Sequence, residues 1–410
     1  MEKSRKPKIR FKGFTDDWEQ RKLKDLVDRV VRKNTNCEST LPLTISAQYG
    51  LVDQVTYFNN RVASRDVTNY YLVLNGEFAY NKSTSDGYPF GAVKRLDMYK
   101  KGVLSTLYIV FVPKDKYRVN SDFLTIFFDT NRWHKGVADR AAEGARNHGL
   151  LNITADDFFD IDLLLPKEIV EQVKIGEFVQ KLDHLITLHQ RKLDTLINVK
   201  KSMLEKMFPK QGSKVPEIRF NGFTDDWEQR ELGELLTKYT DEVNVPHNGY
   251  ERLGIRSHAK GTFHSYVSEG HELQTGKMHR VAADKFIVNI TFGWEHAVAV
   301  TDKNDAGKLV SHRFPQYSLS ENLYSKFFKY IILDDKFKHH LWLSSPGGAG
   351  RNRVLKLNEM LEYKIKIPNV QEQQKIAKVL MDLDNLITLH QRKLEKLKNI
   401  KKSMLEKMFI

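Results

Sequence analysis

The sequence predicts two similar domains, each followed by a long helix, with the two helices paired as an antiparallel coiled coil. Three observations lead to this fold class. Two segments of the chain occur twice in the same order, the residues between them differ in the two halves, and each helical segment is longer than one compact domain can cover.

The repeated segments are close to identical. Residues 7–23 read PKIRFKGFTDDWEQRKL and residues 216–232 read PEIRFNGFTDDWEQREL, with 14 of 17 positions identical. Residues 183–208 and 384–409 agree at 21 of 26 positions. Chance does not produce such agreement, so the chain consists of two tandem halves that meet near residue 209.

The blocks between the repeated segments, about residues 27–165 and 236–365, hardly resemble each other. Two nearly identical scaffold pieces therefore carry two different inserts. The simplest explanation is a scaffold that presents two different recognition surfaces. Duplication followed by neutral drift is the alternative, although drift would also have eroded the scaffold.

Apolar residues recur with the i, i+3, i+4, i+7 spacing of an amphipathic helix from Gln172 to Met207 and again from Gln371 to Met408. At 1.5 Å per residue, each helix spans roughly 55 Å. Pairing with the other copy would bury both stripes, and the repeated halves favour an antiparallel pair. The alternative is that each helix packs on its own domain. The predicted stripes include Leu182, Leu185, Ile186, Leu380, Leu383, Leu386 and Ile387.

The composition points to a polyanionic partner. Lys plus Arg number 66 against 52 Asp plus Glu, a net charge of +14, which favours DNA or RNA ahead of an anionic membrane. A basic protein without such a partner is the alternative. No apolar run is long enough for a transmembrane helix, and the start has no apolar signal region, so a cytoplasmic protein is expected.

Cys37 is the only cysteine, which excludes an intrachain disulfide and a cysteine-based zinc cluster. With no histidine partner in evidence, a small buried side chain is a better interpretation of Cys37 than a nucleophile. The charged run KKSMLEK occurs at 200–206 and 401–407. Such a run is usually a solvated helix face, but its repetition also fits a docking face for a repeated partner.

These motifs together resemble the specificity (S) subunit of Type I restriction-modification systems. GFTDDWEQRKL resembles the start of that family's target recognition domains, LITLHQRKL…KKSMLEKMF its spacer helices, and NKSTSDGYPFGAVKRL at 81–96 a segment common in its recognition domains. The resemblance covers all 410 residues, although the second block shows NITFGWEHAVAV at 289–300 in place of the NKSTSDGYP wording.

The resemblance implies an α/β (α+β) fold with two mixed α/β target recognition domains and a pseudo-two-fold axis. It also implies that each domain reads one half of a split double-stranded DNA sequence, while the coiled coil fixes the gap. Two adenine-N6 methyltransferase (M) subunits and further restriction (R) subunits are the implied partners. The expected domains are residues 1–165 (first recognition domain), 166–209 (first spacer helix), 210–366 (second recognition domain) and 367–410 (second spacer helix).

The sequence offers no catalytic centre, cofactor or metal site. It lacks the [DNS]-P-P-[FYW] methylase motif, the phosphate loop and HExxH, and the adjacent His339 and His340 cannot bind a metal as i, i+4 ligands do. We therefore expect a non-catalytic DNA-reading subunit. A stand-alone sequence-specific nuclease or methylase is the alternative, and a coiled-coil adaptor without nucleic acid is a weaker one.

Candidate DNA contacts follow apolar runs that read as strands. Arg or Lys can bond guanine, and Asn or Gln can bond adenine. The alternative is that these polar residues form an ordinary hairpin tip that does not contact DNA. Residues after the runs 78–80 and 286–288 form the first group, and two Gly-Arg-Asn segments, GARNHG and GAGRNR, form the second. GIRSHAKG and the pair at 312–313 are weaker. The predicted contacts are Asn81, Lys82, Ser83, Thr84, Lys94, Arg95, Arg146, Asn147, Arg256, Lys260, Asn289, Thr291, His296, Arg313, Arg351 and Asn352.

The GFTDDW segments are expected to play a different part. Trp18 and Trp227, with Phe14 and Phe223, are interpreted as contacts that tie each domain to a spacer helix. The adjacent aspartates are acidic and are not expected to face DNA.

Overall fold

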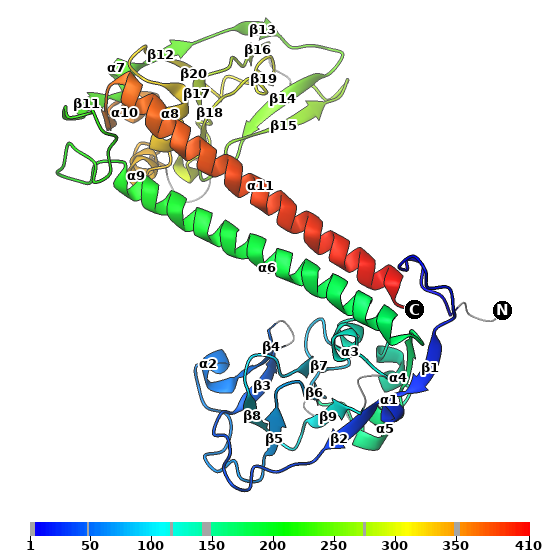
Figure 1. Cartoon of the computed structure of the whole chain (residues 1–410). Coiled ribbons are helices and arrows are strands. Elements are labelled where there is room, and N and C mark those ends of the chain that lie inside the picture. The colour runs from blue at the N-terminus through cyan, green and yellow to red at the C-terminus, as the bar shows by residue number, and fades with distance from the viewer. Residues whose placement is uncertain (1–4, 47–48, 115–117, 142–148, 274–275, 348–352) are drawn as a thin grey trace. The chain divides into compact units, whose positions relative to one another are not determined.

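The computed structural model describes residues 5–46, 49–114, 118–141, 149–273, 276–347 and 353–410. The chain forms two compact units (Figure 1). The first unit comprises residues 1–191 and 392–410, and the second comprises residues 192–391. Each unit therefore contains one variable block and a part of each long helix.

The first unit is a mixed α/β domain. Its central sheet has the strand order β2-β9-β6-β7, and all neighbouring strands are antiparallel. Five short helices and the start of a long helix are also described in this unit. The elements are β1 (Glu19–Lys22), α1 (Leu23–Leu26), β2 (Val27–Val30), β3 (Leu43–Ser46), β4 (Gly50–Asp53), α2 (Gln54–Phe58), β5 (Tyr71–Leu74), β6 (Phe78–Asn81), β7 (Ala92–Arg95), β8 (Lys101–Leu104), β9 (Ile109–Pro113), α3 (Ser121–Phe128), α4 (His134–Ala138), α5 (Ala155–Phe159), β10 (Asp162–Leu165) and α6 (Ile169–Lys206).

The second unit contains an equivalent sheet of order β12-β20-β17-β18, again antiparallel throughout. A second sheet of order β13-β16-β19-β14-β15 lies in the same block. The elements are β11 (Glu228–Glu231), α7 (Leu232–Leu235), β12 (Leu236–Tyr239), β13 (Glu242–Asn244), β14 (Tyr250–Ile255), β15 (Thr262–Val267), β16 (Lys277–Arg280), β17 (Lys285–Val288), η2 (Gly293–Glu295), β18 (Val298–Val300), β19 (Leu309–Val310), β20 (Gln316–Leu319), α8 (Ser325–Ile331), α9 (Asp335–Leu343), α10 (Leu357–Leu361), β21 (Lys364–Ile367) and α11 (Val370–Met408).

Strands β6 and β17 lie inside their sheets and are buried on both faces. Phe78, Ala79 and Tyr80 in β6 are buried, as are all three residues 286–288 in β17. Apolar residues at consecutive positions fit such a central strand, because both faces are covered by other parts of the domain. Polar residues begin where each strand ends, at Asn81 and just after Val288. The candidate DNA contacts therefore start from the most rigid part of each domain.

The two long helices run antiparallel within each unit. In the first unit, Lys401 Nζ lies 2.6 Å from Asp183 Oδ1, while Ile175 shares a core with Met408. Residue numbers therefore increase along α6 in the direction in which they decrease along α11. The second unit repeats the arrangement, with an ion pair between Lys200 and Asp384. These contacts confirm the predicted antiparallel coiled coil and exclude helices that pack only on their own domains.

The buried seam of the helices is narrower than the predicted stripe. Seam residues alternate in steps of four and three, as in Ile175, Val179, Leu182 and Ile186, which is the heptad spacing of a coiled coil. Leu185 and Leu386 were expected in the stripe but are 40% and 43% exposed. A two-helix pair covers only one seam, and Leu185 and Leu386 lie on its flank.

The tryptophan of each GFTDDW segment contacts the end of a long helix, as expected. Trp18 is buried, and its ring lies edge-on to Phe409, 6.0 Å between centroids. Trp227 is placed equivalently against Phe208, also at 6.0 Å. The companion Phe14 lies under Lys174 of α6, with Nζ 4.9 Å from its ring. The short repeated segments therefore join domain and helix in both units.

A buried ion pair joins the same segments to the helix start. Arg10 makes a bidentate contact with Glu171, at 2.6 and 2.7 Å, and the Glu171 side chain is only 1% exposed. Arg219 and Glu372 repeat the contact at 2.9 and 2.8 Å. A bidentate pair of this kind fixes both distance and direction. The entry angle of each helix into its domain is thus set by the same interaction.

Two further observations complete the fold. Cys37 was expected to be buried but is exposed, because it ends a tight turn in which its N–H donates to the Asn34 carbonyl and its φ is +49°.

Among the described residues, every helix is too short or too polar to span a lipid bilayer.

We predict that Arg10→Met lowers the free energy of unfolding of the first unit by about 3–5 kcal/mol, because Glu171 would stay buried without its partner. Urea unfolding of the full chain, followed by tryptophan fluorescence, measures the change. Arg21→Met is the matched control: Arg21 is exposed and pairs only with Glu19, so a change within about 0.5 kcal/mol is expected. Equal effects of the two substitutions would contradict the prediction.

Candidate nucleic-acid interface

In the first unit, a tight turn follows strand β6. The side-chain Oδ1 of Asn81 accepts a hydrogen bond of 3.0 Å from the backbone N–H of Ser83, and this contact forms the turn. Thr84 then donates from its N–H and its hydroxyl to the carbonyl of Gly149, at 2.6 and 3.0 Å. Lys82 accepts from the N–H of Leu151 through its carbonyl. The turn thus lies beside the residues that directly follow the GARNHG loop.

The second unit contains the same turn after strand β17. Asn289 Oδ1 accepts a hydrogen bond of 3.0 Å from the N–H of Thr291. The carbonyl of Ile290 accepts from the N–H of Leu355, at 2.9 Å. In both units, therefore, the turn pairs with the segment that follows the Gly-Arg-Asn loop. We call residues 81–84 and 289–292 the strand-end turns.

All but the last residue of GARNHG and of GAGRNR lies outside the described residues, and so do the four predicted contacts Arg146, Asn147, Arg351 and Asn352. The structure places the residues that follow them. Arg353, the last residue of GAGRNR, has its guanidinium 5.0 Å from the ring of Trp342 and 5.9 Å from that of Trp294. Trp342 was missed at the sequence level, since a single tryptophan in a helix reads as core.

Lys94 and Arg95 are already paired with carboxylates of their own domain. Lys94 Nζ lies 2.7 Å from Asp129 Oδ1, and Arg95 bonds Asp97 and Asp122 at 2.6 and 2.8 Å. Both side chains are mostly buried. Their charge is neutralised inside the unit, so we do not retain these two residues as DNA contacts.

His296 is a second prediction that the structure does not support. It is 4% exposed, and its Nε2 lies 2.7 Å from the carbonyl of Ile332, to which the ring donates. Burial lowers the pKa of the His296 imidazole, which favours the neutral form. A left-handed backbone at His296, φ +61°, turns the chain inward after η2. The side chain therefore packs in the core and cannot reach DNA.

Exposed cations surround the strand-end turn of the second unit. Arg256, Lys260 and Arg313 are all exposed. The Arg256 guanidinium lies 5.4 Å from the ring of Phe263 and bonds the Thr262 carbonyl. Arg313 Nη1 lies 3.5 Å from the Thr291 hydroxyl. No ion pair with an acidic residue holds these three cations within the described residues, so they are suited to bind phosphates or base edges.

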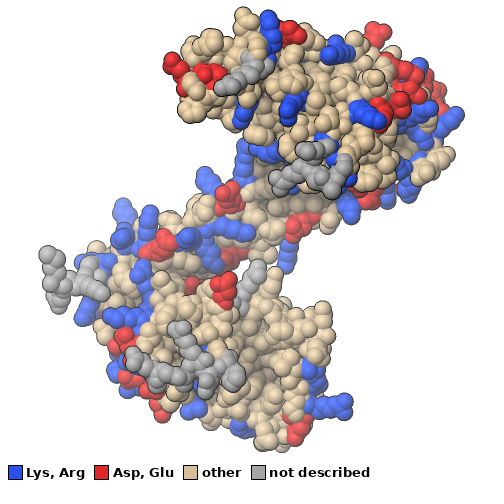
Figure 2. Space-filling model, turned by 180° about the vertical axis from the view of Figure 1, so that it is seen from behind, with Lys and Arg blue, Asp and Glu red and all other residues tan. Residues whose placement is uncertain are grey.

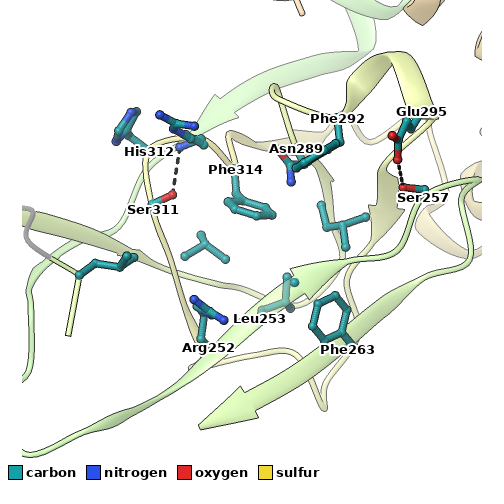
Figure 3. A pocket seen from close by; sticks show the side chains of 15 residues that line it. Arg252, Leu253, Ser257, Phe263, Asn289, Phe292, Glu295, Ser311, His312 and Phe314 are labelled. Atoms are coloured by element: carbon teal, nitrogen blue, oxygen red, sulfur yellow. Dashed lines mark hydrogen bonds between the residues drawn. The ribbon is translucent and has the colours of Figure 1, made fainter. Parts of the chain in front are cut away.

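A cavity of about 670 Å³ lies beside the same turn (Figure 3). Strands β14 and β15 form one wall, and the segments around residues 289–295 and 310–314 form the other. Sequence reasoning missed most of its polar lining, because residues on alternating strands carry no motif. The lining includes Arg252, Leu253, Ser257, Phe263, Asn289, Phe292, Glu295, Ser311, His312, Arg313 and Phe314.

Two broader properties bear on what this surface can do. Figure 2 shows lysine and arginine side chains spread over both units and the helices on one face, with acidic side chains between them. The described residues include no group of three or more His, Cys, Asp or Glu side chains placed to hold a metal ion. The spread of basic side chains supports the binding of an extended anion.

Comparison with known proteins gives matches over most of the chain. A family model described as Type I restriction modification DNA specificity domain matches residues 15–198 and 224–399. A Type I restriction enzyme MjaVIII specificity subunit of Methanocaldococcus jannaschii is 22% identical over 321 residues, covering 75% of this chain and 73% of that protein. A putative MjaX specificity subunit of the same organism is 22% identical over 408 residues, covering 95% and 92%.

A solved structure has a similar fold. The S subunit of a Type-I restriction-modification system from M. genitalium has a TM-score of 0.56 and 14% sequence identity, covering 99% of both chains. At this identity the likeness concerns the fold alone. It agrees with the repeated α/β domains and long helices described above.

Proposed function

The chain belongs to the family of Type I restriction-modification DNA specificity subunits, and we propose that its two domains read the two halves of a bipartite, asymmetric DNA site. Recognition of DNA sequence is the function of this family. The finer assignment is that each unit reads one half-site while the paired helices set the unread gap. A stand-alone nuclease or methylase finds no support among the relatives, which are named specificity subunits.

One observation carries the assignment of two different readers. The strand-end turns share two hydrogen bonds, one to the asparagine Oδ1 from the N–H two residues ahead and one to the following carbonyl from the segment after the loop. They nevertheless share only the asparagine at their first position. Fixed backbone geometry with changed side chains is what two readers of different base pairs require, because bases are distinguished by the side chains that reach their edges.

We retain as proposed DNA contacts the residues that are at least partly exposed, that line the cavity or that the structure leaves undescribed. In the strand-end turns, side chains project from the end of a buried strand, which is a rigid support for base contacts. The proposed recognition domains are residues 1–165 and 210–366, with spacer helices at 166–209 and 367–410. The retained contacts are Asn81, Lys82, Ser83, Thr84, Arg146, Asn147, Arg256, Lys260, Asn289, Thr291, Arg313, Arg351 and Asn352.

We further propose that the chain is non-catalytic and directs partner subunits, namely two methyltransferase subunits and, in the full complex, restriction subunits. Support for two copies of one partner comes from the helices. Leu185 and Leu188 are 40% and 54% exposed, and their counterparts Leu386 and Leu389 are 43% and 46% exposed. Two identical apolar pairs on repeated helices fit two copies of the same partner.

The test of the bipartite assignment is an exchange of residues 27–165 for the corresponding block of another specificity subunit. We expect the methylated adenine motif to change in one half-site and to stay the same in the other, because the second unit and the helices are untouched. Sequencing that detects methylated adenines, in cells that express the variant with its methyltransferase, gives the motif. A change in both half-sites would show that the units do not read independently.

The spacing role of the helices predicts the effect of an insertion. Four residues added near Thr195 lengthen α6 by about 6 Å, roughly one turn, which is close to two base pairs at about 3.4 Å each. We expect the unread gap to grow by one or two base pairs with both half-sites unchanged. Two added residues rotate the seam by about 200° and should disrupt pairing instead. An active four-residue variant with its gap unchanged would make the helices simple connectors.

The leucine pairs predict partner stoichiometry. With Leu185→Asp and Leu188→Asp together, we expect the purified complex to hold one methyltransferase subunit, because an apolar contact is lost on one helix only. The corresponding change at Leu386 and Leu389 should have the same effect, and all four should leave none. Native mass spectrometry measures the composition. Ile197→Asp is the control, since Ile197 is also exposed but has Lys398 as its counterpart; loss of a subunit from it would count against the proposal.

A further inference from the structure

The cavity beside the strand-end turn of the second unit contains an amide donor without a protein partner. Asn289 is 8% exposed as a whole residue, and its Oδ1 is engaged by the N–H of Thr291. Its Nδ2 lies toward the cavity (Figure 3), and no group in the described part of the chain accepts a hydrogen bond from it. Because this donor is reached from the cavity, an acceptor on a ligand can bond it without breaking a hydrogen bond within the domain.

A stacked DNA duplex cannot supply that acceptor. Base edges lie on the floor of a groove about 8.5 Å deep, so only protein elements that protrude can reach them. The Asn289 amide does not protrude, because it lies inside a concave site between two walls of the domain. A ligand of this site must instead project into the protein as a separate chemical group.

The lining indicates which group would fit. Phe263 and Phe292 line the cavity and are each 39% exposed. The Arg256 guanidinium already lies 5.4 Å from the centre of the Phe263 ring, so Phe292 is the better placed of the two for stacking. Phe263 lies directly on the backbone of β14, since a Cβ at Gly254 would come within 2.3 Å of its ring. Flat, exposed aromatic rings in a cavity suit another flat ring, such as a nucleobase.

Polar groups occupy two sides of the cavity. In Figure 3, Arg252 and His312 lie on one side, while Glu295 and Ser257 lie on the other, with Asn289 between. Arg252 is exposed, and within the described residues no carboxylate pairs with it. The Ser257 hydroxyl donates to Glu295 Oε2 at 2.5 Å, which leaves the other carboxylate oxygen able to accept. The side with Arg252 and His312 therefore suits a phosphate. The side with Glu295 and Ser257 suits a base edge that presents a hydrogen-bond donor beside an acceptor.

We propose that this cavity binds a single nucleotide, with its base against Phe292 and Asn289 and its phosphate near Arg252. The nucleotide could be one rotated out of bound DNA or a free mononucleotide, and the chemistry of the site is the same for both. Only the DNA source rests on the function proposed above. In either case Asn289 donates to an acceptor on the base.

The substitution Asn289→Asp tests the donor alone. Aspartate keeps an oxygen for the N–H of Thr291 and nearly the same shape, but it replaces the Nδ2 donor with an acceptor. Glu295→Gln is a second variant, which removes the carboxylate from the opposite side. Asn322→Asp is the matched control, because Asn322 is exposed in the same unit and does not line the cavity.

Two arms separate the two sources. In the first, deoxynucleoside monophosphates are titrated calorimetrically into the full chain. In the second, 2-aminopurine or pyrrolo-deoxycytidine replaces each base of the second half-site in duplex DNA bound to the complex with its methyltransferase. A fluorescence increase at one position, other than the adenine to be methylated, identifies a nucleotide that has left the stack.

We expect a response in at least one arm, weakened about ten-fold in affinity or lost in fluorescence by Asn289→Asp and unaffected by Asn322→Asp. A signal in the DNA arm assigns the extrahelical nucleotide, and a signal only in the titration assigns a free one. No response in either arm, or a response that Asn289→Asp leaves intact, overturns the proposal. Methylation of the bipartite motif by the wild-type complex would then still support the proposed function, so the two failures are distinguishable.

Discussion

The join between each spacer helix and its domain depends on two adjacent side chains at the start of the helix. Glu171 and Glu372 each make a bidentate contact with an arginine of the repeated segments 7–23 and 216–232. The next residue, Gln172, accepts from the N–H of Asn120 and donates to the carbonyl of Pro166, and Gln373 makes the equivalent contacts to Tyr324 and Pro368. All four side chains are buried. A buried charge and a buried amide tolerate little displacement, because any loss of a partner leaves an unsatisfied group.

This constraint explains why so much of the scaffold sequence is repeated while the blocks are not. The arginine, the tryptophan and the helix start must be kept together for either domain to hold its helix in a defined direction. The interior of each domain only has to form its four-stranded sheet, with the order β2-β9-β6-β7 in the first unit and β12-β20-β17-β18 in the second. The strand-end turn of that sheet can vary in sequence. Apolar residues of many kinds can fill such a sheet, so its sequence is free to diverge.

The sequence allowed the repeat, the helices and their pairing to be predicted, because identity and periodicity act over short distances along the chain. It failed where the decisive partner is remote. Lys94 and Arg95 resembled free cations until Asp129 and Asp122 from the α3 region were placed beside them. His296 resembled a surface residue, but a left-handed turn directs it to the carbonyl of Ile332. Leu185 fitted a helical stripe, and only the seam of the pair shows that it lies outside.

The asparagine at each strand-end turn unites these observations. In both units its Oδ1 is used by the backbone two residues ahead, so the residue type is required by the turn before any ligand is considered. That requirement leaves its Nδ2 as the one part of the side chain that can contact something else. In the first unit Asn81 is only partly buried, whereas Asn289 lies within a cavity. The same structural residue can therefore serve two different surroundings, and the surroundings, rather than the asparagine, determine what each domain recognises.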